Sequence, residues 1–142
     1  MALPVSVNYW TVLAAAVASI ILGFLWYGPL FGKQWLKLMG FSEKQIKQMK
    51  ENSQKGMTKT YTVMVVSTLV TAYVLAHFVG YLQALSVGDG IVLGFLLWIG
   101  FLATSQIGSV LWEQKPVKLY MINTLYNLVN LCVMAVILAV WA

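Results

Sequence analysis

The sequence predicts an all-α membrane protein, a bundle of four transmembrane helices with one short amphipathic helix between the first and second. Three observations predict this fold. Of the 142 residues, 61% are apolar and only 9% are charged, whereas soluble domains average about 45–50% and about 25%. The charged residues lie between long uncharged runs. The apolar residues are also too numerous for a soluble chain of this length to hide. We therefore expect a single membrane domain, residues 1–142.

Four uncharged runs reach the roughly 20 residues that a helix needs to cross a bilayer. They cover residues 10–31, 60–82, 91–112 and 119–141. A long basic segment (32–59) connects the first two, a Gly-Asp-Gly hairpin (83–90) the second and third, and a short turn (113–118) the last two. The first run lacks the flanks of a cleavable signal peptide. We therefore expect all four spans in the working protein.

The lysines predict the orientation in the membrane. All nine lie in segments 32–59 and 113–118, and the chain has no arginine. The positive-inside rule then predicts a multi-pass protein of the cell (inner) membrane, with 32–59 and 113–118 cytoplasmic and both termini outside. Aromatic residues near the span ends are typical interface anchors: Trp10 and Trp141 outside, and Trp26, Tyr27, Trp35 and Trp112 inside.

The basic segment has internal order. Ser42 and Gln45 form a capping-box pattern, which predicts a helix from Glu43 to about Gln54. Its lysines, which include Lys44, Lys47 and Lys50, fit two interpretations. The helix lies on anionic lipid headgroups, or it docks an acidic protein.

Small residues at four-residue spacing predict how the spans pack, because they allow helices to approach closely. The rows are Ala15, Ser19 and Gly23 in the first span, Ala72, Ala76 and Gly80 in the second, and Gly100, Thr104 and Gly108 in the third. Such rows serve an intramolecular bundle or a homo-oligomer, and for the latter we favour a dimer.

The fourth span carries three asparagines on one helical stripe, Asn123, Asn127 and Asn130. At a rise of about 1.5 Å per residue, they share their depth with polar residues of other spans: Asn123 and Asn127 with Ser67 and Gln106, and Asn130 with Thr71. We expect a buried polar seam in the cytoplasmic half. It acts as interhelical glue, or as a cavity for a solute, an ion or a lipid headgroup.

His77 lies on a second stripe with Tyr73 and Tyr81. Three interpretations are open. It is a neutral imidazole bonded to tyrosine or backbone, a pH-responsive group near Asp89, or a haem or metal ligand that needs a second ligand from another subunit. Trp98, seven residues into its span, is expected to pack rather than to anchor.

Several constellations are missing from the sequence. No carboxylate lies within a span, and the chain has one cysteine, no Cys-x-x-Cys pair and no phosphate-binding glycine loop. Neither a carboxylate pair nor a nucleophile with a placed base can be assembled. We therefore expect a protein that is not an enzyme and has no cofactor, no metal and no nucleic-acid partner.

Several blocks of the sequence resemble a family of small four-span membrane proteins, widespread in bacteria and catalogued as a domain of unknown function. The blocks are Asn8-Tyr-Trp10, Gly23-Phe-Leu-Trp-Tyr-Gly-Pro-Leu-Phe-Gly-Lys-Gln-Trp35, Leu97-Trp-Ile-Gly-Phe101 and Glu113-Gln-Lys-Pro-Val-Lys-Leu-Tyr120. The resemblance implies the fold and topology but no activity. From the residues we expect a non-enzymatic binder or transporter of a small molecule or lipid, which uses the polar seam. The alternative is a structural or accessory subunit that docks a partner through the Lys-rich segment.

Overall fold

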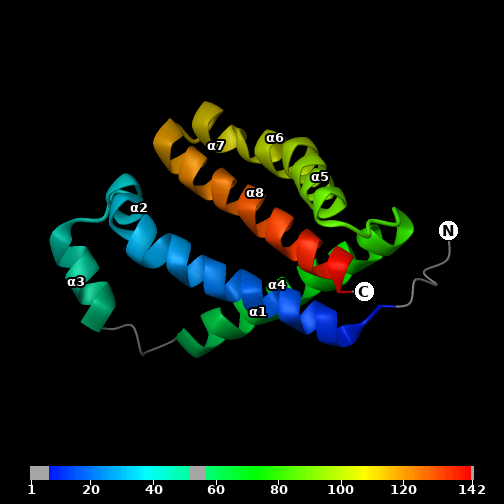
Figure 1. Cartoon of the computed structure of the whole chain (residues 1–142). Coiled ribbons are helices and arrows are strands. Elements are labelled where there is room, and N and C mark those ends of the chain that lie inside the picture. Colours follow the sequence, from blue (N-terminus) through cyan, green and yellow to red (C-terminus); the bar gives the residue numbers. More distant parts are fainter. Residues whose placement is uncertain (1–6, 52–56, 142) are drawn as a thin grey trace.

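The computed structural model describes residues 7–51 and 57–141, and within them it is almost entirely helical with no β-strand (Figure 1). The elements follow in this order: α1 (Tyr9–Leu25), the π-helical segment η1 (Trp26–Leu30), α2 (Gly32–Leu38), α3 (Glu43–Glu51), α4 (Met57–Tyr81), α5 (Val87–Leu97), the π-helical segment η2 (Trp98–Ala103), α6 (Thr104–Gln106), α7 (Gly108–Leu111) and α8 (Val117–Val140).

Four stretches of helix are long and apolar enough to cross a membrane: Tyr9–Leu30, Thr58–Tyr81, Val87–Leu111 and Val117–Val140. They coincide with the four predicted spans, although the third begins at Val87 rather than at residue 91. The predicted all-α fold with four membrane-spanning helices is therefore confirmed.

Helix α8 is the central helix of the bundle. It packs against α1, α4 and α5, and α1 also packs against α4. The core lies along this helix, where Met134 and Ala135 are fully buried. Because α8 contacts every other long helix, its side chains can form sites with each of them.

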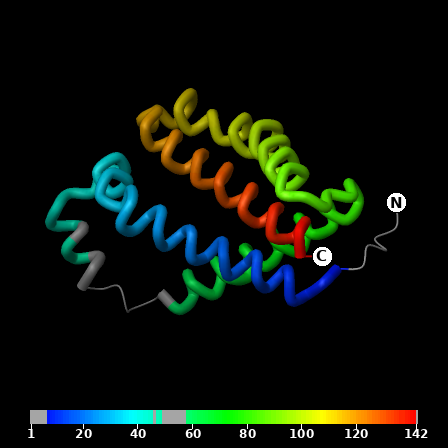
Figure 2. The backbone as a smooth tube through the Cα atoms, in the orientation of Figure 1, coloured from blue at the N-terminus to red at the C-terminus, as the bar shows by residue number. Residues whose placement is uncertain are grey.

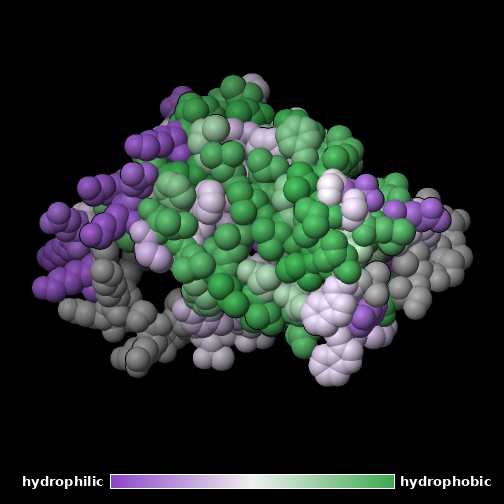
Figure 3. Space-filling view, viewed as in Figure 1, coloured by the Kyte–Doolittle hydropathy of each residue, from purple (hydrophilic) through white to green (hydrophobic). Residues whose placement is uncertain are grey.

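The two ends of the bundle differ in charge. One end, called the basic end here, contains α2, α3 and the turn before α8, with Lys33, Lys37, Lys44, Lys47, Lys115 and Lys118; hydrophilic side chains gather there in Figure 3. The opposite end holds the beginning of α1 and the end of α8 (Figure 2). There the Thr11 hydroxyl donates a 2.6 Å hydrogen bond to the carbonyl of Trp141.

Helices α5 and α8 make their closest contact near the opposite end. A Cβ atom added to Gly90 would lie 2.7 Å from Val136 Cα, and one added to Gly94 would lie 2.8 Å from Cys132 Cα. These glycines were not in the predicted row of the third span. In that row Gly100 has no neighbour within 4 Å for an added Cβ, so the packed face of the span is a different one.

Helix α5 begins earlier than predicted, because residues 87–90 belong to the helix and the connection from α4 is limited to residues 82–86. The Ser86 Oγ accepts a 3.1 Å hydrogen bond from the Asp89 N–H, and the Asp89 carboxylate accepts one from the Leu85 N–H. Ser86 is thus the N-cap of α5, and the Gly-Asp-Gly sequence forms its first turn.

Helix α4 joins the bundle through one half only. Ala72, Leu75 and Val79, in the half toward the opposite end, are buried, whereas Val63 and Val66 in the other half are more than half exposed. The basic half of α4 therefore lies away from α8. Its polar residues, which include Ser67, are separated from those of α8.

The basic segment contains two short helices. The predicted capping box at the start of α3 is present, since Ser42 N–H donates to Gln45 Oε1 at 2.9 Å and Gln45 N–H donates to Ser42 Oγ at 3.2 Å. The predicted end of this helix, at about Gln54, and the side chain of Lys50 lie outside the described part of the chain. Helix α2 was not predicted as a separate element.

Candidate functional site

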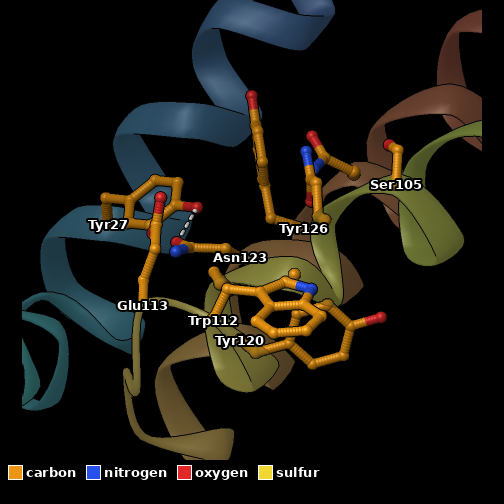
Figure 4. A pocket seen from close by; sticks show the side chains of 11 residues that line it. Tyr27, Ser105, Trp112, Glu113, Tyr120, Asn123 and Tyr126 are labelled. Carbon is orange, nitrogen blue, oxygen red and sulfur yellow. Dashed lines mark hydrogen bonds between the residues drawn. The ribbon is translucent and has the colours of Figure 1, made fainter.

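A cavity of about 640 Å³ opens between η1, α6, α7 and α8 at the basic end (Figure 4). We call it the first cavity. The described residues that line it are Tyr27, Ser105, Gln106, Gly108, Ser109, Trp112, Glu113, Tyr120, Asn123, Tyr126 and Asn127. Three residues of the predicted polar seam, Gln106, Asn123 and Asn127, therefore line the same cavity.

Two hydrogen bonds organise the amides in this cavity. The Tyr27 hydroxyl donates to Asn123 Oδ1 at 2.7 Å, shown as a dashed line in Figure 4, and Asn127 Nδ2 donates to Gln106 Oε1 at 3.2 Å. Each bond joins α8 to another span. Each primary amide has donors and acceptors beyond the atom used here, so the amides keep hydrogen-bonding capacity for a further group.

The cavity exists because helices that are close at one end separate toward the other. Gly90 and Gly94 hold α5 against α8 near the opposite end. Toward the basic end large side chains take over: Trp98 Nε1 donates to the carbonyl of Thr124 at 2.7 Å, and the Tyr120 hydroxyl donates to the carbonyl of Ala103 at 2.6 Å. These side chains act as spacers between the helices. The bond of Trp98 to α8 also confirms the prediction that this residue packs inside the bundle.

Helix α1 is fixed to the other side of α8 in a similar way. Trp26 Nε1 donates to the carbonyl of Ile122 at 3.1 Å. Trp26 starts η1 and Trp98 starts η2, so each π-helical segment begins at a tryptophan bonded to the α8 backbone. The two bonded carbonyls flank Asn123 in the sequence, which fixes the part of α8 that faces the cavity.

The other predicted members of the seam do not reach the first cavity. Ser67 and Thr71 are exposed on α4, where the Thr71 hydroxyl donates to the carbonyl of Ser67 within the helix. Ser67 and Thr71 match the seam residues in depth along the membrane normal, but they do not contact them because the basic half of α4 lies away from α8. Asn130 is also outside the lining, and its Oδ1 is buried without a hydrogen-bond partner among the described residues.

A second cavity of about 520 Å³ adjoins the first and shares Tyr27, Ser109, Tyr120 and Asn123 with it. Its remaining wall has a different character, with the apolar or aromatic residues Trp35, Leu36, Met39 and Leu119 and one cation, Lys115. The two cavities thus share a wall, and the second is the more apolar of the two.

The predicted interface anchors fall into two groups. Trp10, Trp112 and Trp141 are exposed near the ends of the bundle. Trp26, Tyr27 and Trp35 are partly buried and make internal contacts, such as the edge-on contact of Tyr27 with Trp35 at 5.8 Å between ring centroids. Tyr27 and Trp112 line the first cavity.

His77 is buried on α4, away from both cavities. Its Nδ1 lies 2.9 Å from the carbonyl of Tyr73, and the Tyr73 ring packs edge-on against the imidazole. This geometry matches the first of the three interpretations, an imidazole that is hydrogen-bonded to the backbone. Among the residues that the structure describes, no group of three or more His, Cys, Asp or Glu could hold a metal ion.

Sequence reasoning did not assign Tyr120 and Tyr126 to the site. Tyr120 precedes Asn123 by three residues and Asn127 by seven, so it lies on their helical stripe, and that spacing was available in the sequence. Tyr126 is placed by the first span instead: a Cβ added to Gly23 would lie 3.1 Å from its hydroxyl oxygen. No pattern within the fourth span indicates that contact.

Comparison with known proteins gives one family. A family model described as "Protein of unknown function (DUF1761)" matches residues 10–139. No curated protein and no solved structure matches the chain significantly. The match covers all four spans and both cavities, and the chain therefore belongs to the DUF1761 family of proteins of unknown function.

Proposed function

We propose that this protein binds a small molecule in the first cavity, as a membrane receptor or carrier without catalytic activity. The observation that carries the proposal is the union of an open cavity of about 640 Å³ with three amides that retain free hydrogen-bonding atoms. Sites for small molecules commonly measure about 300–1,000 Å³ and contain a few placed polar groups.

Interhelical glue accounts for the polar residues less well than binding does. Glue requires that polar groups satisfy one another across a closed interface. Here Asn123 uses its Oδ1 and Asn127 its Nδ2 in the described bonds, while the space between them stays open. Holding polar groups at membrane depth around an open space is costly, and a bound molecule offsets that cost.

Native mass spectrometry of the protein, released gently from its membrane, tests the proposal. Asn127→Leu removes a cavity amide, and Asn130→Leu makes the same change three residues along α8 but outside the lining. We expect a stoichiometric bound mass with the unchanged protein and with Asn130→Leu, and its loss with Asn127→Leu. Bound masses that are the same in all three proteins would contradict the proposal.

The alternative, an accessory subunit that docks through Lys44, Lys47 and Lys50, makes a different prediction. It expects no bound mass that depends on Asn127, and a co-purifying acidic protein that is lost with Lys44→Glu. The exposure of Lys44 and Lys47 on α3 is compatible with this role and equally with contact to anionic lipid headgroups.

We further propose that the basic end faces the cytoplasm across the inner membrane, with both termini outside. The lysine distribution supports this orientation. A reporter enzyme that is active only outside the membrane, fused after Trp141, is expected to be active, and one fused within 113–118 is expected to be inactive. The reverse pattern would overturn the orientation.

A homodimer is the proposed assembly. The outward-facing basic half of α4 and the exposed Gly100 and Thr104 leave surfaces on which a second copy can pack. The same mass spectra count the subunits: twice the mass of the chain supports the dimer, and a monomer at all detergent concentrations contradicts it.

A further inference from the structure

The walls of the first cavity indicate the charge of its ligand. Its described lining contains no aliphatic side chain and no Lys, Arg or His. Its one carboxylate, Glu113, lies 3.5 Å from the Lys115 ammonium, so that charge is already paired. An acyl chain would meet amides, hydroxyls and aromatic rings here but no aliphatic side chain, and a phosphate or carboxylate would meet no free cation among these residues. The lining therefore matches an uncharged polar group.

The hydrogen-bonding groups indicate what that uncharged group carries. With the described bonds in place, Asn123 keeps its Nδ2, Gln106 its Nε2 and Asn127 its Oδ1. The cavity thus offers both N–H donors and a carbonyl acceptor. A hydroxyl group donates and accepts at once, so neighbouring hydroxyls on one ligand can satisfy all three amides.

The aromatic residues complete this match. Tyr126 and Tyr120 reach the cavity from α8, and Trp112 reaches it from the turn after α7, in the view of Figure 4. The face of an aromatic ring is electron-rich, and it attracts the partly positive C–H face of a saturated ring. Amides together with aromatic faces suit a ring that carries hydroxyls on its edge.

The second cavity indicates that such a ring can belong to an amphiphile. It meets the first cavity at Tyr27 and Asn123, and its wall includes Leu36, Met39 and Leu119. A polar head in the first cavity would therefore leave an apolar continuation beside suitable side chains. Lipid headgroups lie at each end of a membrane-spanning helix bundle, and both cavities lie toward one of these ends.

We propose that the first cavity recognises an uncharged, polyhydroxylated group, a sugar or a related polyol. Its source is a lipid headgroup, with its chain beside the second cavity, or a free sugar. This inference rests on the proposed function and adds the ligand class. A quaternary ammonium, which aromatic cages also bind, fits less well because Glu113 is paired with Lys115.

The test uses the whole protein, purified in a polyoxyethylene detergent that carries no sugar and placed in nanodiscs. The nanodiscs hold equal amounts of glucosyl-diacylglycerol, diacylglycerol and phosphatidylcholine with identical chains. We expect native mass spectrometry to find the glucosyl lipid retained about fivefold or more over diacylglycerol, as lost hydrogen bonds imply. Asn127→Leu and Gln106→Leu are expected to abolish this preference, and Asn130→Leu is expected to retain it.

A second measurement identifies the source. Tryptophan fluorescence is titrated with glucose and with octyl glucoside below its micellar concentration, and Trp112→Phe identifies the responding residue. Tighter binding of octyl glucoside by about tenfold or more, the effect of burying apolar area, indicates a lipid headgroup. Equal affinities indicate a free sugar.

Three outcomes would overturn the inference. They are equal retention of glucosyl-diacylglycerol and diacylglycerol with no response to either sugar, retention of phosphatidylcholine above both, and a sugar preference that Asn127→Leu leaves unchanged in a folded protein. If a mass that depends on Asn127 is still bound and carries no sugar, the ligand class alone fails. If no such mass is bound, the proposed function fails with it.

Discussion

The hydroxyl of Tyr27 and the amide of Asn123 are joined by a 2.7 Å hydrogen bond in the wall that the two cavities share. Tyr27 belongs to η1, at the basic end of the first span, and Asn123 belongs to α8. The bond fixes the orientation of the Asn123 amide, since its Oδ1 is the acceptor, and Nδ2 is left as a donor. Tyr27, which the sequence suggests is an interface anchor, thereby determines that Asn123 presents a hydrogen-bond donor to the cavity.

Tyr27→Phe removes this bond without changing the ring. We expect the free energy of unfolding to fall by about 0.6–1 kcal/mol, the usual worth of a single bond between helices or side chains. Equilibrium unfolding in mixed micelles measures the change. Tyr61→Phe, on an exposed ring of α4 with no described hydrogen bond of its hydroxyl, is the matched control and should have no effect. An equal loss in both variants would show that the bond contributes nothing.

Gly94→Ala tests the close contact between α5 and α8. The new Cβ would lie 2.8 Å from Cys132 Cα and N, which are backbone atoms that cannot turn away. The helices must separate, and we expect a loss of about 1–3 kcal/mol in stability, as for other overpacked sites.

The control for that variant is Gly100→Ala, in the same span. A Cβ there has no neighbour within 4 Å, so the variant should be as stable as the unchanged protein, or more stable through the helix propensity of alanine. Thermal unfolding followed by circular dichroism compares the two. If Gly100→Ala is the more damaging, the packed face of the third span has been assigned wrongly.

Trp98→Phe tests the spacer on the far side of α8. The substitution removes the only described donor to the Thr124 hydroxyl and carbonyl from another span, and Thr124 is only 1% exposed. The Thr124 carbonyl keeps its helical hydrogen bond within α8, but the Thr124 hydroxyl oxygen loses its described donor, and a buried acceptor without a donor costs about 1–3 kcal/mol. Trp112→Phe, at a residue that is 86% exposed, should change stability by less than about 0.5 kcal/mol. Unfolding curves of equal midpoint for the two variants would refute this role for Trp98.

Asn130→Leu is expected to leave the protein at least as stable as before. Its Oδ1 is buried without a described partner, and replacing an unsatisfied polar group by an apolar one removes a penalty of about 1–3 kcal/mol. Thermal unfolding is again the measurement. A clear loss of stability would mean that Asn130 has a partner in the membrane that the isolated chain does not provide, such as a lipid or a second subunit.

The spans were predictable because their cause is local. A run of about 20 uncharged residues must cross the bilayer as a helix, whatever the rest of the chain does. The capping box was also predictable from local sequence, because its two partners, Ser42 and Gln45, are only three residues apart in the chain. The start of α5 was equally readable, because Ser86 and Asp89 have the same spacing as a capping pair, and the Gly-Asp-Gly sequence concealed it.

The site was only partly predictable, because it depends on how helices cross. Depth along the membrane normal brought Gln106 and Asn127 together correctly, since their helices are neighbours. The same reasoning failed for Ser67, whose depth matches but whose helix leaves the bundle in that half. Tyr126 depends on the glycine opposite it at position 23, a relation between residues of the first and last spans that no single-span pattern contains.

The central position of α8 constrains the order in which the protein can assemble. Synthesis delivers this helix after the other three spans, yet α5 has its main packing surface on α8, and the Thr11 hydroxyl donates a hydrogen bond to the carbonyl of Trp141. Until α8 inserts, the membrane holds an α1–α4 hairpin and a separate third span whose glycine face is bare. Ribosome-bound chains that stop before Val117 should therefore present two independent units, and completion of the last span should join them in one step.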